Sequence, residues 1–251
     1  MRVVSAVVCV AMLASAAQAV VFSDDFDSYA DTAAMLAPGA WGDEGVPAAG
    51  TALSIGFGNP VNSAWHPGGA VMGHDLPNLF PSDADPIVYS ADIYVQEGTG
   101  KRLSVGLRDN GDGSSLNSII EMGLYNAAVN PDTGLTEDGF AIRTVFINGN
   151  PANWVGFGQP AVTGWHNMKA TIGATSIVFD LDLGDDGTVD KSLTITTDDT
   201  SAIGYNVLRI GGPSGIASAG GGFGVDNVNI VPEPASLALL GLGMFLLRRR
   251  R

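Results

Sequence analysis

The stretch IVYSADIYV, residues 87–95, alternates so that Tyr89, Ala91, Ile93 and Val95 share one face of an extended chain. A period of two is typical of an antiparallel strand with one side in the core. The same alternation recurs outward from this stretch in both directions. Besides residues 87–95 it predicts the strands Ala52–Phe57, Arg102–Arg108, Ser118–Tyr125, Phe140–Ile147, Trp165–Ile172, Ile177–Leu183, Val189–Ile195, Asn206–Ile210 and Phe223–Val231.

Clusters of Gly, Asp and Asn separate these strands, notably at residues 110–113 and 184–187, and are typical of hairpin turns. We find no internal repeat with a period of roughly 20 to 50 residues. About ten strands over residues 20–230 therefore predict an all-β fold, a two-sheet antiparallel sandwich of the jelly-roll type. Only residues 31–36 show a pattern for a short helix.

The composition excludes several classes of protein. The 251 residues carry 12 Lys+Arg and 26 Asp+Glu, a net charge of −14. Five of the basic residues stand at the ends, so residues 20–231 hold seven basic residues against 25 carboxylates, a net charge of −18. A body this acidic repels phosphate, which argues against nucleic acid as a partner. The 34 Gly, the 13 Pro and the 15% of charged residues argue against a coiled coil or a helical bundle.

The N-terminal 19 residues have the pattern of a secretory signal peptide. One arginine precedes an apolar run over residues 3–17, and Ala17-Gln18-Ala19 forms an A-x-A cleavage site. We predict cleavage by signal peptidase after Ala19, the alternative being a buried N-terminal strand or helix. The only cysteine, Cys9, follows Val8, which does not suit a lipoprotein signal. The mature chain then has no thiol for a disulfide, a metal or a nucleophile.

The C-terminus combines a short apolar run with basic residues. A helix of the 13 residues Ala235–Leu247 spans roughly 20 Å, less than the roughly 30 Å of a hydrocarbon core. Flanking residues would extend the span, and Arg248, Arg249, Arg250 and Arg251 would stay on the cytoplasmic side of the inner membrane. These properties predict a C-terminal transmembrane anchor with the body outside.

The same segment resembles a known sorting signal. Pro232-Glu233-Pro234, the apolar run and the terminal arginines look like the PEP-CTERM signal of exopolysaccharide-producing bacteria. The resemblance implies an exosortase-type protease as a partner, which cuts near the motif and releases the body to the cell surface or extracellular matrix. Residues 231–251 are then a sorting segment, 1–19 a signal peptide and 20–230 one β-sandwich domain. The alternative is a plain tail anchor that is never cut.

The body itself resembles concanavalin A-like, laminin G-type jelly rolls. The resemblance rests on the motifs FSDDFD (residues 22–27), WHNMKATI (165–172), the hairpin through residues 182–190, and GVDNVNI (224–230). It implies that the first and last strands of the body pair. It also implies a structural Ca²⁺ between them, with Asp25 or Asp27 joining Asp226 as oxygen ligands, a donor type suited to a hard cation. The alternative is that Val225 faces inward, leaving Asp226 solvated and capping a turn.

A catalytic site is not expected. Hydrolysis of glycans needs two carboxylates flanking the bond, but the E-x-D-x-x-E signature of sandwich-fold glucanases is absent and Glu121 is expected to point to solvent. The acidic run over residues 180–190 fails the EF-hand pattern and fits solvated turns. A polysaccharide lyase or hydrolase with an atypical site stays as the alternative.

Four tryptophans could offer flat faces for sugar rings. Trp41, Trp65 and Trp154 fall in Gly/Pro-rich stretches, where a binding site is expected, whereas Trp165 opens a strand and is expected in the core. Plugs at the rim of the sandwich are the alternative for each of the three. The sequence thus predicts an exported, non-enzymatic protein that binds extracellular polysaccharide or has a structural role.

Overall fold

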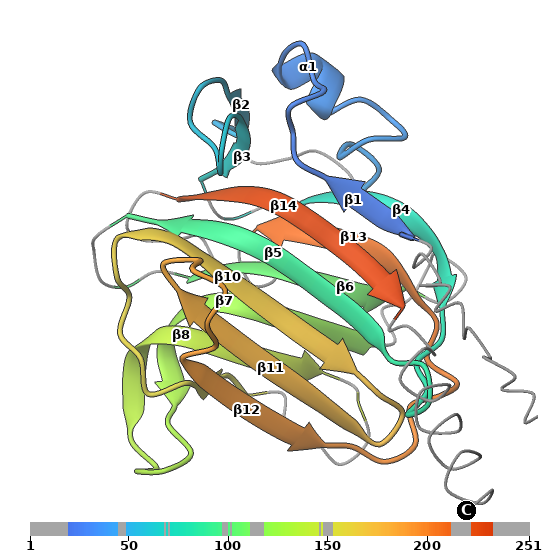
Figure 1. Ribbon diagram of the computed structural model, residues 1–251, viewed down its shortest axis with the longest axis vertical. Helices are drawn as coiled ribbons and strands as arrows, with labels where there is room; N and C mark the ends of the chain where they lie inside the picture. The colour runs from blue at the N-terminus through green and yellow to red at the C-terminus, as the bar shows by residue number, and fades with distance from the viewer. Residues whose placement is uncertain are drawn as a thin grey trace, which may run out of the picture.

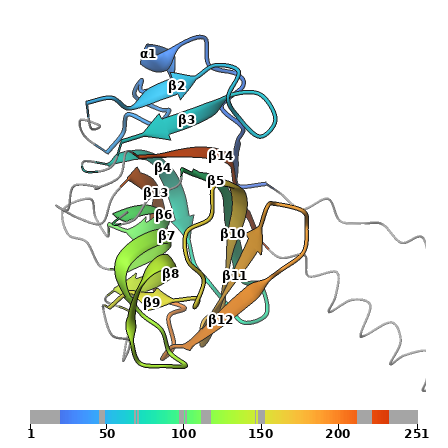
Figure 2. The ribbon, with the colours of Figure 1, turned by 90° about the vertical axis from the view of Figure 1, so that its left-hand side faces the viewer.

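The protein folds into two antiparallel β-sheets packed face to face. The computed structural model describes residues 20–44, 49–67, 69, 71–96, 100, 102–110, 118–145, 147, 153–211 and 222–232. Figure 1 shows one sheet in front of the other, and Figure 2 shows the two layers from the side. Among the described residues the only helix is the single turn α1 (Thr32–Met35), which Asp31 caps by accepting a hydrogen bond from the amide of Ala34.

The front layer is an eight-stranded sheet with the order β12-β11-β10-β5-β14-β3-β2, to which β1 adds by pairing with β14. Its strands are β1 (Phe22–Asp24), β2 (Ala52–Ser54), β3 (Ser63–His66), β5 (Ile87–Val95), β10 (Gly164–Ile172), β11 (Ser176–Leu183), β12 (Lys191–Thr196) and β14 (Phe223–Pro232).

The second layer is a six-stranded sheet with the order β4-β13-β6-β7-β8-β9. Its strands are β4 (Met72–Leu79), β6 (Arg102–Asp109), β7 (Ser118–Val129), β8 (Thr136–Val145), β9 (Val155–Gly156) and β13 (Tyr205–Gly211). The described part of the chain thus confirms the all-β, two-sheet jelly-roll sandwich.

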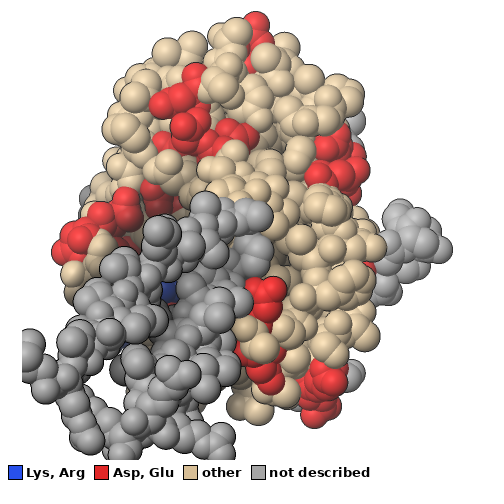
Figure 3. All heavy atoms as spheres, turned by 45° about the vertical axis from the view of Figure 1, so that its right-hand side comes forward, with Lys and Arg blue, Asp and Glu red and all other residues tan. Residues whose placement is uncertain are grey.

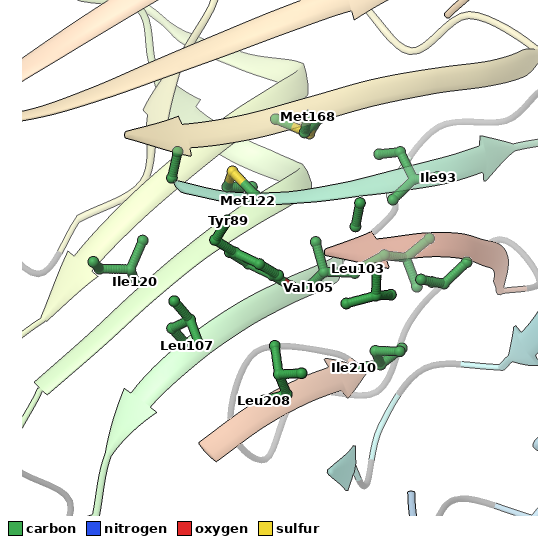
Figure 4. Close-up of a cluster of buried hydrophobic side chains, with 14 of the residues drawn as sticks. Tyr89, Ile93, Leu103, Val105, Leu107, Ile120, Met122, Met168, Leu208 and Ile210 are labelled. Carbon is green, nitrogen blue, oxygen red and sulfur yellow. The ribbon is translucent and has the colours of Figure 1, made fainter. Parts of the chain in front are cut away.

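The core lies between the two sheets and is built by the alternation seen in the sequence. Tyr89, Ala91 and Ile93 of β5 are at most 1% exposed and face the six-stranded sheet. Figure 4 shows Tyr89 and Ile93 among Leu103, Met122 and other side chains that converge from both layers. Removing this apolar surface from water is the main stabilising contribution to the sandwich. The intervening residues of β5, including Asp92 and Tyr94, therefore lie on the outer face of the eight-stranded sheet.

The first and last strands of the body pair, as expected. Phe22 is opposite Ile230 and Asp24 is opposite Val228. At the end of β1, the carboxylate of Asp24 accepts hydrogen bonds from the indole N–H of Trp41 (2.7 Å), the hydroxyl of Tyr29 (2.7 Å) and the amide of Phe26 (2.8 Å). Asp24 therefore ties the segment that follows β1 to this strand.

The six-stranded sheet corrects the expectation for Glu121. Its side chain is fully buried instead of pointing to solvent, and its carboxylate accepts hydrogen bonds from Arg143 (Nη2 at 2.6 Å, Nε at 2.9 Å) and Arg209 (Nη1 at 2.9 Å). Register places the three residues in one row, since Gly106 pairs with both Glu121 and Arg209, and Glu121 pairs with Arg143. A buried carboxylate is tolerated here because two guanidinium groups neutralise it.

Candidate functional site

A pocket of about 550 Å³ opens at one end of the eight-stranded sheet. Three segments line it: Asn59 from the β2–β3 loop, residues 162–166 at the start of β10, and residues 183–185 at the end of β11. Two of these segments are joined by the His166 ring, whose Nε2 lies 2.8 Å from the carbonyl oxygen of Val162 while Nδ1 accepts from the amide of Gly184 at 3.0 Å. Burial lowers the pKa of His166, so the ring is neutral, and its two hydrogen bonds hold the start of β10 against the end of β11.

Two further aromatic rings pack against Trp165, which lines the pocket. Trp165 and Tyr94 are register partners on β10 and β5, with ring centres 5.4 Å apart, and Phe57 from the β2–β3 loop lies 4.8 Å from Tyr94 and 5.9 Å from Trp165. Phe57 is 38% exposed and the other two rings are half-buried. The next position of the row is Gly224, where a Cβ would come within 3.3 Å of both Tyr94 and Trp165.

Trp165 therefore lies on the outer face and lines the pocket, so its expected place in the core is wrong. The error came from its position at the start of a strand whose other end is buried. The parity of β10 places His166 and Met168 in the core, and this turns Trp165 and Asn167 outward.

A row of polar side chains runs beside the aromatic row. Asp92 of β5 is 3% exposed, and its carboxylate accepts from the amide groups of Asn167 (2.7 Å), Asn227 (2.7 Å) and Asn59 (3.0 Å). Burial is the main cause that raises the pKa of Asp92, and these amide donors oppose it. Asp92 and Asp226 are direct register partners on β5 and β14, so two carboxylates lie side by side.

The sequence left open whether Asp226 or Val225 faces the core, and in the structure Val225 faces inward while Asp226 faces outward and is still buried. A bulge at Asn227, where φ is +45°, shifts the register of β14 between residues 226 and 229. Val225 and Val228 both face inward as a result, and Asp226 faces outward. The Asp226 side chain is nevertheless only 1% exposed, and its carboxylate accepts hydrogen bonds from the backbone amides of Asn59 (2.6 Å) and Asn227 (2.7 Å). Burial, with Asp92 and Asp27 nearby, raises its pKa to about 7.

Asn59 holds these groups together. Its backbone amide donates a hydrogen bond to Asp226. Its side-chain Nδ2 donates to Asp92 and to Asp185 (2.5 Å), and its backbone carbonyl accepts from the side chain of Asn227 (2.5 Å). Asn59 thus joins the β2–β3 loop, the centre of the sheet and the β11–β12 hairpin at one point. Neither Asn59 nor Asp92 has a motif around it, and only the fold brings them together.

The three residues expected to bind calcium all accept hydrogen bonds from backbone amides. Asp27 accepts from the amide of Asn62, and Asp25 is exposed and accepts from the amide of Asp27. Both oxygens of Asp226 accept backbone hydrogen bonds. Among the residues that the structure describes, no group of three or more His, Cys, Asp or Glu is arranged to hold a metal. Calcium stays a prediction, and melting with and without EDTA tests it.

Two of the tryptophans expected to contact glycans do not suit that role. Trp41 is fully buried between Phe22 and Phe26. Trp154 is 4% exposed, stacked on Tyr125 with ring centres 4.9 Å apart and contacted by Arg143. Trp65 differs, because it is half-buried on the outer face of β3, directly opposite Gly224 in the aromatic row. It stays a predicted glycan contact.

The terminal segments fall almost wholly outside the described residues, including Ala17, Ala19, Glu233, Pro234 and the arginines 248–251. Pro232 is the last residue of β14. Within the described ranges, no helix has the length and apolar character needed to cross a bilayer.

Residues 231–251 match the family described as the PEP-CTERM protein-sorting motif. No curated protein matches the chain. Solved structures similar to it include the lectin UEA-II complexed with galactose, with 13% identity, 85% of this chain and 98% of the lectin covered, and a TM-score of 0.49. The CBM2 module of the Lactobacillus casei BL23 phage J-1 evolved Dit has 14% identity, 84% and 94% coverage and a TM-score of 0.48.

The alginate lyase from Alteromonas sp. 272 is a further similar structure, at 12% identity, 66% and 80% coverage and a TM-score of 0.41. These are similarities of strand arrangement at low scores, and a shared fold does not carry an activity with it.

Proposed function

We propose that this protein is exported to the cell surface or extracellular matrix and that its β-sandwich binds carbohydrate without cleaving it. The observation that supports this most is the pairing of an aromatic surface with a row of hydrogen-bonding side chains at one pocket. Trp165, Tyr94 and Phe57 offer apolar ring faces, and Asn59 and Asp185 offer polar atoms beside them.

This combination suits a sugar ring. A pyranose presents C–H groups on its faces, which pack on aromatic rings, and hydroxyl groups around its edge, which need partners when they leave water. Pockets that bind small ligands have this composition, mostly apolar walls with a few placed polar groups. The rigid positions of the rings on β5 and β10 limit the entropy lost on binding.

The proposed lack of catalysis rests on the arrangement of the carboxylates. Asp92 and Asp226 are each held by several N–H donors, and both face Asn59 rather than opposite sides of an open cleft. General acid–base cleavage of a glycosidic bond needs two carboxyl groups on either side of the bond. The lyase or hydrolase alternative is therefore kept as an outcome of the experiment.

The route of export follows from the two ends of the chain. We propose that signal peptidase removes residues 1–19, that residues 231–251 act as the sorting segment recognised by an exosortase-type protease, and that residues 20–230 are the delivered domain. The match to the sorting motif supports the second step. In addition, β1 begins at Phe22, so cleavage after Ala19 leaves the first strand intact.

A glycan array followed by titration calorimetry with the purified body tests the function. We expect selective binding to a subset of glycans and at least about a tenfold loss of affinity in Trp165→Ala, since one aromatic–sugar stack contributes roughly 1–3 kcal/mol by analogy with stacked bases. Phe80→Ala is the matched control, because Phe80 is 57% exposed and lies outside the pocket lining. Thermal melting of both variants checks that each is folded; Trp165→Ala should melt somewhat lower, since it loses ring contacts with Tyr94 and Phe57.

Two results would contradict the proposal. Silence across the array would leave a surface protein without a glycan ligand. Formation of reducing ends or unsaturated products from any bound polysaccharide would show an enzyme instead of a binding protein.

A further inference from the structure

We propose that the pocket at Trp165 selects glycans whose sugar rings carry no acidic group, and that it prefers rings with a free amino group over neutral rings. This inference rests on the proposed carbohydrate binding and specifies the class of sugar. It follows from the charges that surround the pocket on the described residues.

Carboxylates surround the pocket on two sides. Asp185 lines it, and Asp182 and Asp190 lie in the same hairpin close enough to act on the charge of His166. Asp92 lies behind Asn59, on β5. Its neighbour Asp226 adds little charge near pH 6, because burial raises its pKa to about 7. Backbone amides or asparagine side chains hold these groups, for example Gly187 on Asp182 and Leu183 on Asp190. These uncharged donors neutralise none of the negative charge of the carboxylates.

Within the described residues, the pocket lining contains no Lys or Arg, and none of these carboxylates forms a salt bridge. Lys169, on the outer face of β10, is in an ion pair with Asp180 at 2.9 Å. Lys191 lies at the start of the edge strand β12, opposite Leu181. The described arginines all belong to strands of the six-stranded sheet: Arg102, Arg108, Arg143 and Arg209. His166 is neutral and uses both ring nitrogens in hydrogen bonds.

This electrostatic setting discriminates between sugars. A uronate or sulfate entering the pocket would lose hydration, find no cation and be repelled by several carboxylates, which is costly at a partly buried site. A sugar hydroxyl can donate to Asp185 without such a cost. A protonated sugar amine gains a charge-assisted hydrogen bond in addition. In Figure 3 several acidic patches lie on the face shown, and among its described residues red atoms far exceed blue ones, so the long-range field acts in the same direction.

Matched pentasaccharides of β-1,4-linked glucosamine, glucose and mannuronate test the inference by titration calorimetry at a pH of about 6. We expect the glucosamine oligomer to bind most tightly and the mannuronate oligomer at least about tenfold more weakly, because each lost or gained ion pair changes the affinity by this order. Raising the salt from about 50 mM to about 500 mM should narrow the difference.

Asp185→Asn assigns the preference to this pocket. Asn suits the φ of +52° at this position and preserves the size of the side chain. We expect it to weaken binding of both oligomers, and to lower the ratio of the glucosamine affinity to the glucose affinity about fivefold, because only the protonated amine loses an ion pair. Asp132→Asn is the matched control, since it removes one charge from an exposed hairpin outside the pocket. It should change neither affinity.

The outcomes separate this inference from the proposed function. Mannuronate binding as tight as glucosamine binding, abolished by Trp165→Ala, would overturn the selectivity and leave glycan binding in place. A preference for glucosamine that survives Trp165→Ala and falls equally in Asp185→Asn and Asp132→Asn would be a general charge effect, which also overturns the inference. Silence of all three oligomers and of the array would overturn both.

Discussion

At Asp226 the burial of a carboxylate beside two others raises its pKa to about 7, and this makes the stability of the sandwich depend on pH. In the unfolded chain the pKa returns to about 3.8, so between these values the native state holds a proton that the unfolded state has released. The free energy of unfolding should therefore fall as the pH rises from about 4 to about 7, by an amount on the order of 2–4 kcal/mol, and level off above.

Urea denaturation at a series of pH values measures this slope. Asp226→Asn should flatten it, because the titrating group is gone, whereas Asp132→Asn should leave it unchanged. A stability of the parent protein that rises steadily between these pH values would show that Asp226 is ionised in the native state.

Glu121 is the second residue whose charge should affect stability. In Glu121→Gln the isosteric side chain keeps the shape but leaves Arg143 and Arg209 without a neutralising charge. We expect the free energy of unfolding to fall by about 3–5 kcal/mol, as for other broken buried ion pairs. Denaturant titration checks this, with exposed Asp132→Asn as the reference, and a loss below about 1 kcal/mol would contradict the assigned role.

At the residue scale, the sequence indicated which residues have a structural or binding role more accurately than it indicated which way their side chains point. The importance of Asp226 could be read from its position in a strand, but its outward turn depends on a bulge at a non-glycine residue with positive φ, which no pattern announces. Trp165 and Glu121 were misplaced for a related reason. Each faces away from the core according to strand parity, and only tertiary neighbours determine whether such a side chain is exposed, buried in a salt bridge or part of a pocket.

At the scale of elements, the join between β1 and the segment that follows it depends on Asp24. Asp24→Ala removes the acceptor for Trp41 and Tyr29 and leaves a buried indole N–H without its partner. We expect a loss of about 2–3 kcal/mol from these hydrogen bonds to an ionised group. Asp25→Ala is the matched control one residue away, because Asp25 is exposed and accepts one local bond. Thermal melting of both variants distinguishes them, and equal losses would refute the role of Asp24.

The strands were predictable where they alternate. β5, β6, β10, β11 and β13 lie close to their expected ranges, because each has one face in the core. β4, with the sequence MGHDLPNL, was missed because it is an edge strand. Its C-terminal half is largely exposed, so its sequence shows no alternation of apolar and polar residues. The expected strand at residues 52–57 ends at Ser54, and the rest forms the loop that brings Phe57 and Asn59 to the pocket. The turn at residues 110–113 lies largely outside the described residues.

At the scale of the whole molecule, the closing strand β14 determines where the domain can be cut. Val228–Pro232 pairs with β5 and with β1 in the middle of the eight-stranded sheet. A chain of residues 20–232 should therefore fold with the melting temperature of the chain of residues 20–251. A chain of residues 20–227 should fail to give a cooperative transition, because β1 loses its partner strand and one half of the central strand β5 loses its pairing with β14. Cooperative melting of the shorter chain would contradict the domain limits.

The sequence predicted the whole-molecule properties most fully, since composition, alternation and terminal motifs each act without tertiary context. Sandwich class, acidic surface and sorting segment follow from such features. The location of the pocket does not, because it depends on how three loops far apart in the chain, around Asn59, Val162 and Asp185, meet over one end of the sheet.

The extent of β14 has a consequence for maturation. The sorting motif begins at Val231, yet Val231 and Pro232 are strand residues of β14 in register with Val88 and Ile87 of β5. The paired strand and the sorting motif therefore overlap at residues 231 and 232. Proteases generally cleave extended, unpaired backbone. A peptidase acting at this junction must therefore either cut beyond Pro232, leaving a short scar on the released domain, or wait for the end of the sheet to fray.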